Sequence, residues 1–154
     1  MNYLVVEQSM NPQKAKGKRY EYEIRDYFKS IGYEECIVSS SESINADNMG
    51  IDLLNLPFII QCKSGYKTGL NKNKVITTIQ TKIKKSKYKD QLVFLFHKSS
   101  RKTEVSFDIE TYHKIKTEKS FSSIEYLCLK DGIVTVDFTT FKEYLENGRN
   151  KRLF

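Results

Sequence analysis

Hydrophobic positions recur with a helical period over residues 14–31. Spacings of three and four residues separate most of them, which is the spacing that places side chains on one face of a helix. The stripe consists of Tyr20, Ile24, Tyr27, Phe28 and Ile31. It stops at Gly32, a residue type that commonly ends helices. The pattern therefore predicts an amphipathic helix over this range.

Two more helices are predicted further along the chain. Residues 72–87 form a lysine-rich amphipathic segment with Val75, Ile79 and Ile83 on one face. Near the C-terminus, Thr140 and Glu143 have the spacing of a capping box, which marks a helix start. The apolar residues of that last helix are Phe141, Tyr144 and Leu145.

Shorter apolar runs between these helices predict strands. Residues 92–96 read as a buried central strand, because their apolar run is continuous. Residues 104–109 alternate, which predicts a more exposed strand. The other predicted strands are 35–39, 51–54, 58–63 and 133–138, with a polar loop at 39–49 and a tight turn at 55–57.

Helices alternating with strands favour an α/β sandwich around a mixed sheet. No internal repeat or Pro/Gly-rich linker divides the sequence, so residues 1–154 are expected to form a single domain.

The charge of the chain and its cysteines indicate the class of binding partner and the cellular compartment. The chain has 26 Lys and Arg against 19 Asp and Glu, a formal charge of +7, which favours a polyanionic partner. Its three cysteines form no CxxC pair, which argues against a disulfide framework or a cysteine-rich zinc site and favours a reducing compartment. The apolar run at 3–6 is too short for a signal peptide or a membrane span. We therefore expect a cytoplasmic protein with no membrane partner.

Polar side chains at the end of the predicted strand 58–63 suggest a site. Gln61 and Lys63 point to the same face, since side chains alternate along a strand. Asp52 lies close to both if the preceding strand pairs beside this one. Oxygen ligands of this kind suit Mg²⁺ or Mn²⁺, and a neighbouring ammonium can orient a metal-bound water. Such a group of side chains fits hydrolysis of a phosphodiester.

These residues resemble the PD-(D/E)xK nuclease superfamily. Its core has an acid on the first helix, an Asp at a strand end and an acid-x-Lys on the next strand, and the matching residues here are Glu21, Asp52 and Gln61-Cys62-Lys63. Lys16-Gly17-Lys18-Arg19-Tyr20-Glu21 also looks like the start of archaeal and phage Holliday-junction resolvases. The resemblance covers roughly the first half of the chain.

The resemblance implies a restriction-endonuclease-like core, a central mixed sheet flanked by helices. It also implies a prokaryotic or viral protein acting in the host cytoplasm on branched DNA. Asp52, Gln61 and Glu21 are then expected to hold Mg²⁺ or Mn²⁺, and Lys63 to position the attacking water.

Gln61 departs from the usual motif, because most members have Glu or Asp at this position. The change removes a charge from the expected metal site. A Gln-x-Lys version is, however, common in Mrr-type restriction endonucleases, which this segment also resembles. Two alternatives therefore stay open: an Mrr-like restriction endonuclease, and a non-catalytic DNA-binding protein that kept the nuclease fold.

Several candidate residues have equally simple structural interpretations. Glu21 and Glu23 flank the apolar stripe on opposite sides, so periodicity does not choose between them, and only the spacing from Gly17 seen in the resolvases favours Glu21. Lys63 also fits a strand-end lysine, and Asp52 a turn acid. Asp47 is a weaker alternative ligand, His97 and His113 are expected to be structural, and Gln80 has no independent support.

Lysines at two places predict a DNA-binding surface. Lys82, Lys84 and Lys85 lie in the predicted middle helix, and a solvated helix face is the alternative explanation for them. Lys16, Lys18 and Arg19 are placed ahead of the first helix, with Arg149, Lys151 and Arg152 as further support at the C-terminus.

Junction resolution requires two symmetric cuts, so a chain with one site is expected to form a homodimer. Phe121, Tyr126 and Phe141 are candidates for its surface, with core packing as their alternative role.

Overall fold

The computed structural model describes residues 11–65, 69–99, 102–117, 126 and 128–150. They form an α/β fold around a five-stranded mixed sheet with the strand order β3-β4-β5-β7-β6. β3 runs parallel to β4, and the other neighbours are antiparallel. The strands are β3 (Ile59–Lys63), β4 (Val93–Ser99), β5 (Lys102–Asp108), β6 (Cys128–Lys130) and β7 (Ile133–Asp137). The predicted mixed sheet is therefore confirmed.

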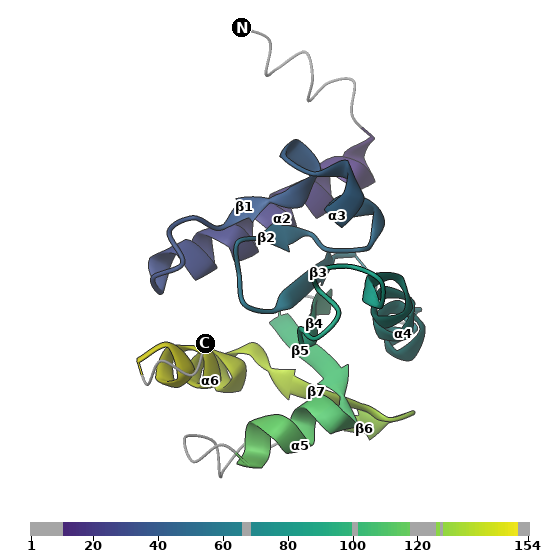
Figure 1. Cartoon of the computed structure of the whole chain (residues 1–154), viewed down its shortest axis with the longest axis vertical. Coiled ribbons are helices and arrows are strands. Elements are labelled where there is room, and N and C mark those ends of the chain that lie inside the picture. The colour runs from purple at the N-terminus through teal and green to yellow at the C-terminus, as the bar shows by residue number, and fades with distance from the viewer. Residues whose placement is uncertain (1–10, 66–68, 100–101, 118–125, 127, 151–154) are drawn as a thin grey trace, which may run out of the picture.

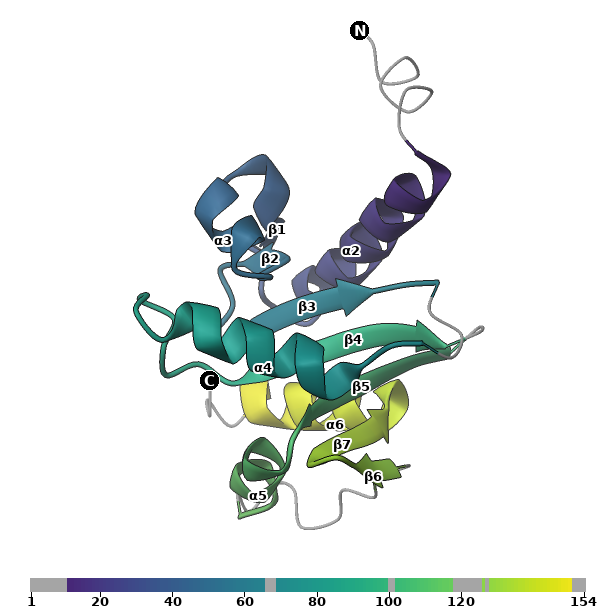
Figure 2. The same cartoon turned by 90° about the vertical axis from the view of Figure 1, so that its right-hand side faces the viewer.

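Helices cover both faces of this sheet (Figures 1 and 2). One face packs against α2 (Pro12–Ser30), α5 (Ile109–Thr117) and α6 (Phe138–Asn150). The other face packs against α4 (Lys72–Ile83) and the short α3 (Ile44–Asn48). A separate two-stranded ribbon of β1 (Ile37–Val38) and β2 (Leu53–Leu54) lies next to α2.

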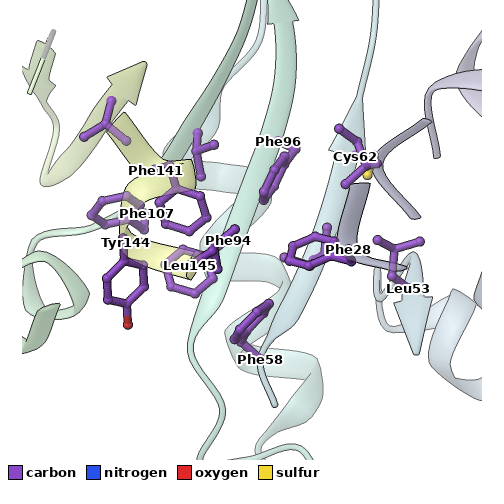
Figure 3. Packing of buried hydrophobic residues seen from close by; sticks show 14 of the residues in the cluster. Phe28, Leu53, Phe58, Cys62, Phe94, Phe96, Phe107, Phe141, Tyr144 and Leu145 are labelled. Carbon is purple, nitrogen blue, oxygen red and sulfur yellow. The ribbon is translucent and has the colours of Figure 1, made fainter. Parts of the chain in front are cut away.

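Aromatic side chains fill the core under α2 and α6 (Figure 3). Phe94 and Phe96 of β4 are both fully buried, and their rings lie 4.9 and 5.7 Å from that of Phe141. Phe96 also meets Phe28 of α2 with the ring centroids 5.9 Å apart. Tilted and edge-on pairs of this kind add to the free energy gained from burial. They fix α2, and with it Glu21, against the sheet.

The opposite core is aliphatic and lies under α4. Ile59 and Leu95 of the sheet face Ile76, Ile79 and Ile83 of the helix. Because side chains alternate along a strand, β3 places Ile60 and Cys62 in the aromatic core and Ile59 and Gln61 on the α4 side. The α4 side is therefore the face on which the candidate polar residues lie.

The first helix begins earlier than predicted. α2 starts at Pro12, a residue type favoured in the first turn because its missing N–H needs no partner there. Lys16, Lys18 and Arg19 lie within the helix, inside the range 14–31 predicted for it, so their placement ahead of the helix was wrong. The helix ends as predicted: Gly32 has φ 112°, and the Tyr33 N–H donates to the Phe28 carbonyl at 3.0 Å.

The lysine-rich helix is shorter than predicted. α4 ends at Ile83, and the Ser86 hydroxyl donates to the Ile83 carbonyl at 2.8 Å while accepting from the Tyr88 N–H at 3.0 Å. Serine competes in this way with continuing helical hydrogen bonds. Lys84 and Lys85 consequently lie in turns beyond the helix and not on its face.

The segment predicted as a loop at 39–49 contains two short helices. Ser39–Ser41 form a 3₁₀ turn, and α3 follows with Ser43 as its N-cap, whose side chain accepts from the Ala46 N–H at 3.2 Å. Ala46 is buried in the aliphatic core, which holds this polar segment in place. The polar composition of this segment predicted a loop, whereas the Ser43 cap and the buried Ala46 stabilise the helix α3.

β5 was predicted to be more exposed than the strand at 92–96, but it is the central strand of the sheet. Val105, Ser106 and Phe107 are fully buried. The Ser106 hydroxyl forms hydrogen bonds with His97 of β4 and Thr135 of β7, the two neighbouring strands. After it, α5 was missed altogether. The Asp108 side chain caps this helix by accepting from the Thr111 N–H at 2.7 Å, and Tyr112 and Ile115 anchor it in the core.

The last helix starts at Phe138, so the predicted capping box at Thr140 was wrong. Asp137 performs that role, since its side chain accepts from the Thr139 N–H at 3.3 Å. Phe141 is fully buried and is unable to contribute to a dimer surface. Tyr126 is 50% exposed and packs edge-on against Tyr112, whereas Phe121 lies outside the described residues.

Cys36, Cys62 and Cys128 are free thiols, and the first two are buried. None of the helices in the described ranges has the length and apolar content that a membrane crossing requires.

Candidate active site

The Asp52 carboxylate lies against Gln61. The Asp52 N–H donates to the Ile60 carbonyl at 2.8 Å, which places the start of β2 beside β3. Asp52 Oδ2 then accepts from Gln61 Nε2 at 2.6 Å and from the Cys62 N–H at 2.7 Å. Both side chains are buried, with only 6% and 7% of their surface exposed. The turn at 55–57 thus brings together two residues that are nine positions apart.

Glu21 and Lys63 complete a cleft around this pair. The cleft has a volume of about 1350 Å³ and is lined by α2, α3, α4 and the end of β3. Figure 2 shows these three helices arranged around β3. Glu21 lines it, whereas Glu23 pairs with Lys98 at 3.7 Å and lines a separate hollow. Of the two acids between which periodicity did not choose, Glu21 is therefore the one that lines the cleft. Asp47 of α3 also lines the cleft.

Burial dominates the electrostatics of the acids. It raises the pKa of Asp52 from 3.8 to about 8, and the nearby Glu21 adds to the rise, while the Cys62 N–H and Lys63 oppose it. Burial also raises the pKa of Glu21, against the ion pair with Lys18 at 3.7 Å. Two carboxylates with raised pKa values facing one cleft favour either protons or a cation between them.

The donor set fits a hard divalent cation held by few protein ligands. No three His, Cys, Asp or Glu side chains among the described residues come close enough together to bind a metal ion. Mg²⁺ is often bound by only one or two carboxylates and keeps several waters. Asp52 and Glu21 match that requirement, because a cation would restore the charge that burial disfavours.

Gln61 is oriented differently from a metal ligand. Its Nε2 donates to Asp52, so its Oε1 points to Gly50, where an added Cβ would lie only 2.8 Å from it. A ligand role through the amide oxygen therefore requires the side chain to turn over. In the observed arrangement Gln61 is a hydrogen-bond donor that orients the Asp52 carboxylate.

Gly50 is required by this arrangement, and Gly50→Ala tests it. An alanine Cβ would lie 2.8 Å from Gln61 Oε1 and 2.9 Å from Ile79 Cγ1, at a φ of 85°. We expect the free energy of unfolding to fall by about 3 kcal/mol, from strain and overpacking together. Gly132→Ala is the control, since Gly132 has φ 75° but nothing within 4 Å. Its expected loss is about 1 kcal/mol. Equal losses in chemical denaturation would contradict the close approach to Gln61.

Asp52 predicts a pH dependence of stability. Its pKa is higher in the folded than in the unfolded state, so its protonated form favours folding. This contribution to stability is fully present below pH 4 and is lost as the pH rises toward 8. Between pH 6.5 and 8 the free energy of unfolding should fall by about 2 kcal/mol without metal. His97 changes the free energy of unfolding little in this window. Burial lowers its pKa from 6.5 to about 4, so most of its contribution to the pH dependence falls between pH 4 and 6.5.

Urea unfolding in EDTA measures this dependence, with Asp52→Asn as the comparison. The variant has no charge at this position and should keep its stability across the same window. A wild-type slope that survives in the variant would show that another group causes it.

Lysines form both walls of the cleft. Lys18 of α2 and Lys82 of α4 line it, as does Lys74, which sequence reasoning missed. Lys74, Thr78 and Lys82 are four residues apart, a spacing that places them on one helix face and that would have identified Lys74. Lys16 Nζ would lie 3.9 Å from a Cβ added at Gly65, close to the end of β3. Arg19, Lys84 and Lys85 are exposed and do not line the cleft.

His97 belongs to a buried polar network and not to the cleft. Its Nε2 lies 2.8 Å from Ser106 Oγ, which lies 2.7 Å from Thr135 Oγ1, and Lys72 Nζ donates to that threonine at 3.0 Å. This supports its predicted structural role. His113 is exposed, and Gln80 donates to Asp108 outside the cleft.

Comparison with known protein families, characterised proteins and solved structures finds no match to this chain.

Proposed function

We propose that this protein is a metal-dependent DNA endonuclease of the PD-(D/E)xK type that cleaves branched DNA. One observation carries the proposal: Glu21, Asp52, Gln61 and Lys63 meet in a single cleft with lysines on both walls. The chain order of a helix acid, then Asp52, then x-Lys at the end of the next strand is the order that the resemblance implies, although Asp52 precedes β2 and does not end a strand. The restriction-endonuclease-like core is part of the same proposal.

Each residue has a defined task in the proposed reaction. Asp52 and Glu21 would hold Mg²⁺ or Mn²⁺, and the bound ion would supply activation of the attacking water and neutralisation of phosphate charge. Gln61 and the Cys62 N–H fix the Asp52 carboxylate through Oδ2. Lys63, on the cleft side of β3, positions the attacking water and stabilises charge on the phosphate.

The lysine walls support a nucleic acid backbone as the ligand. Lys14 and Lys18 line the cleft from α2, and Lys74 and Lys82 line it from α4. A strand passing between them would have its phosphates contacted from both sides while one phosphate approaches Asp52. Binding should weaken steeply as salt rises, because each phosphate contact releases counterions.

A gel assay on a four-way junction, a linear duplex and a single strand of matched sequence tests the proposal. With Mg²⁺ or Mn²⁺ we expect paired, symmetric cuts in the junction, and none in EDTA. Paired cuts need two sites, so they also test the proposed homodimer, whereas a single nick contradicts it. Equal cutting of the duplex would favour the Mrr-like alternative.

The non-catalytic alternative has one observation in its favour. The Gln61 amide donates to Asp52 Oδ2 at 2.6 Å, so this buried oxygen has a hydrogen-bond partner without a cation. Binding of DNA without cleavage under any metal condition would select this alternative and contradict the nuclease.

A further inference from the structure

Ile44 is an exposed apolar residue on α3, a helix that lines the cleft. Among the described residues it is the most exposed large hydrophobic side chain, at 77%. It is the first residue of α3, and Asp47 and Asn48, three and four residues later, line the cleft. Residues with these spacings share a helix face, so Ile44 lies on the same face of α3 as Asp47 and Asn48, about one turn nearer the N-terminus of the helix.

The segment that carries Ile44 is held firmly. Ala46, two residues on, is buried in the aliphatic core, and the Ile51 N–H donates to its carbonyl at 3.0 Å. Lys82 Nζ donates to the Asn48 carbonyl at 3.1 Å, and Lys18 Nζ contacts Ser40 Oγ from the opposite wall. The Ser39 N–H donates to the Asp52 carbonyl at 2.8 Å. Ile44 therefore lies on a segment, residues 39–51, that is hydrogen-bonded directly to the Asp52 backbone.

We propose that Ile44 is a wedge that enters an unstacked base step and selects branched over continuous duplex DNA. This inference rests on the proposed function. The lysines of both walls supply the charge complementarity that brings a nucleic acid over the cleft. Apolar residues flanked by phosphate contacts open base steps at a cost of stacking energy, and that cost is smallest where the stack is already interrupted. A branch point offers such an interruption next to the phosphate to be cut.

The experiment measures binding in EDTA to a four-way junction and a duplex of equal length, each with 2-aminopurine at the central step. Ile44→Ala should weaken junction binding about tenfold, the value of one lost base contact, and change duplex binding by less than about twofold. Wild-type protein should raise the 2-aminopurine fluorescence of the junction, and the variant should not. Ile44→Leu, which keeps the apolar side chain, should restore both signals.

Leu129→Ala is the matched control, because Leu129 is an aliphatic side chain with 47% exposure on β6, away from the cleft. It should leave both affinities unchanged. Equal loss on the two substrates in Ile44→Ala, no loss, or no fluorescence rise with wild-type protein would each overturn the wedge.

Cleavage with Mg²⁺ is scored separately. An enzyme that cleaves and keeps its junction preference in Ile44→Ala overturns the wedge but not the nuclease. Junction binding that depends on Ile44 without any cleavage overturns the nuclease but not the wedge.

Discussion

Asp52→Asn should reduce DNA cleavage by on the order of a thousandfold while making the metal-free protein more stable at pH 8. The buried carboxylate is the central anionic group of the cleft, and its removal leaves Glu21 as the only acid of the proposed metal-binding pair. Asparagine has nearly the same shape, and its amide oxygen can accept the hydrogen bonds from Gln61 and the Cys62 N–H. The charge disfavoured by burial disappears, so stability should rise as activity falls.

Lys63→Ala should reduce cleavage by a similar factor, because it removes the only cation that the end of β3 contributes to the cleft. Steady-state rates on the preferred DNA measure both effects, and binding in EDTA shows whether affinity survives.

Glu23 and Lys98 provide matched controls for these two substitutions. They pair with each other at 3.7 Å outside the cleft, on the same helix as Glu21 and on the strand next to Lys63. Glu23→Gln and Lys98→Ala should leave the rate within about twofold. Full activity in Asp52→Asn or Lys63→Ala would remove these residues from the mechanism.

Gln61→Glu should lower the divalent cation concentration needed for half-maximal cleavage by about tenfold. The substitution places a second carboxylate where Nε2 now lies, 2.6 Å from Asp52 Oδ2. Two carboxylates this close do not both ionise without a cation, so the metal-free variant should be less stable than wild type at pH 8. A hard cation between them relieves the repulsion and binds more tightly. Titration of the melting temperature and of cleavage with Mg²⁺ and Mn²⁺ measures both effects.

Gln80→Glu tests whether tighter cation binding requires that the added carboxylate lie in the cleft. Gln80 Nε2 also donates to a carboxylate, that of Asp108, but this pair lies outside the cleft. The variant should be destabilised without any change in the metal requirement for cleavage. If Gln61→Glu needs as much metal as wild type, the cation does not lie between residues 52 and 61.

Local sequence determined the elements whose pattern is long or strongly apolar. The stripe ending at Gly32 fixed α2 to within two residues at each end, because a helix must bury one face and glycine adopts the positive φ of its C-cap. β3 was predicted to within one residue and β4 only in its apolar part, since β4 continues through polar residues to Ser99, beyond the predicted end at 96. Short elements with few apolar residues, such as α3, gave no comparable signal.

Alternation along β3 was sufficient to place Gln61 and Lys63 on one face, and the turn at 55–57 was sufficient to bring Asp52 beside them. Those relations are local, spanning twelve residues or fewer, so the backbone geometry of strand and turn determines them.

Tertiary packing decided the rest of the site. Whether Glu21 or Glu23 faces the cleft depends on which side of α2 packs into the aromatic core. The contact of Phe28 with Phe96 sets the rotation of α2 about its axis. The aliphatic packing of α4 on the other face of the sheet places Lys74 and Lys82 across the cleft from the lysines of α2. The orientation of the Gln61 amide is decided by the buried Asp52 oxygen that it satisfies. Sequence patterns carry no information on such contacts, because they join segments whose distance apart is fixed only when the sheet is assembled.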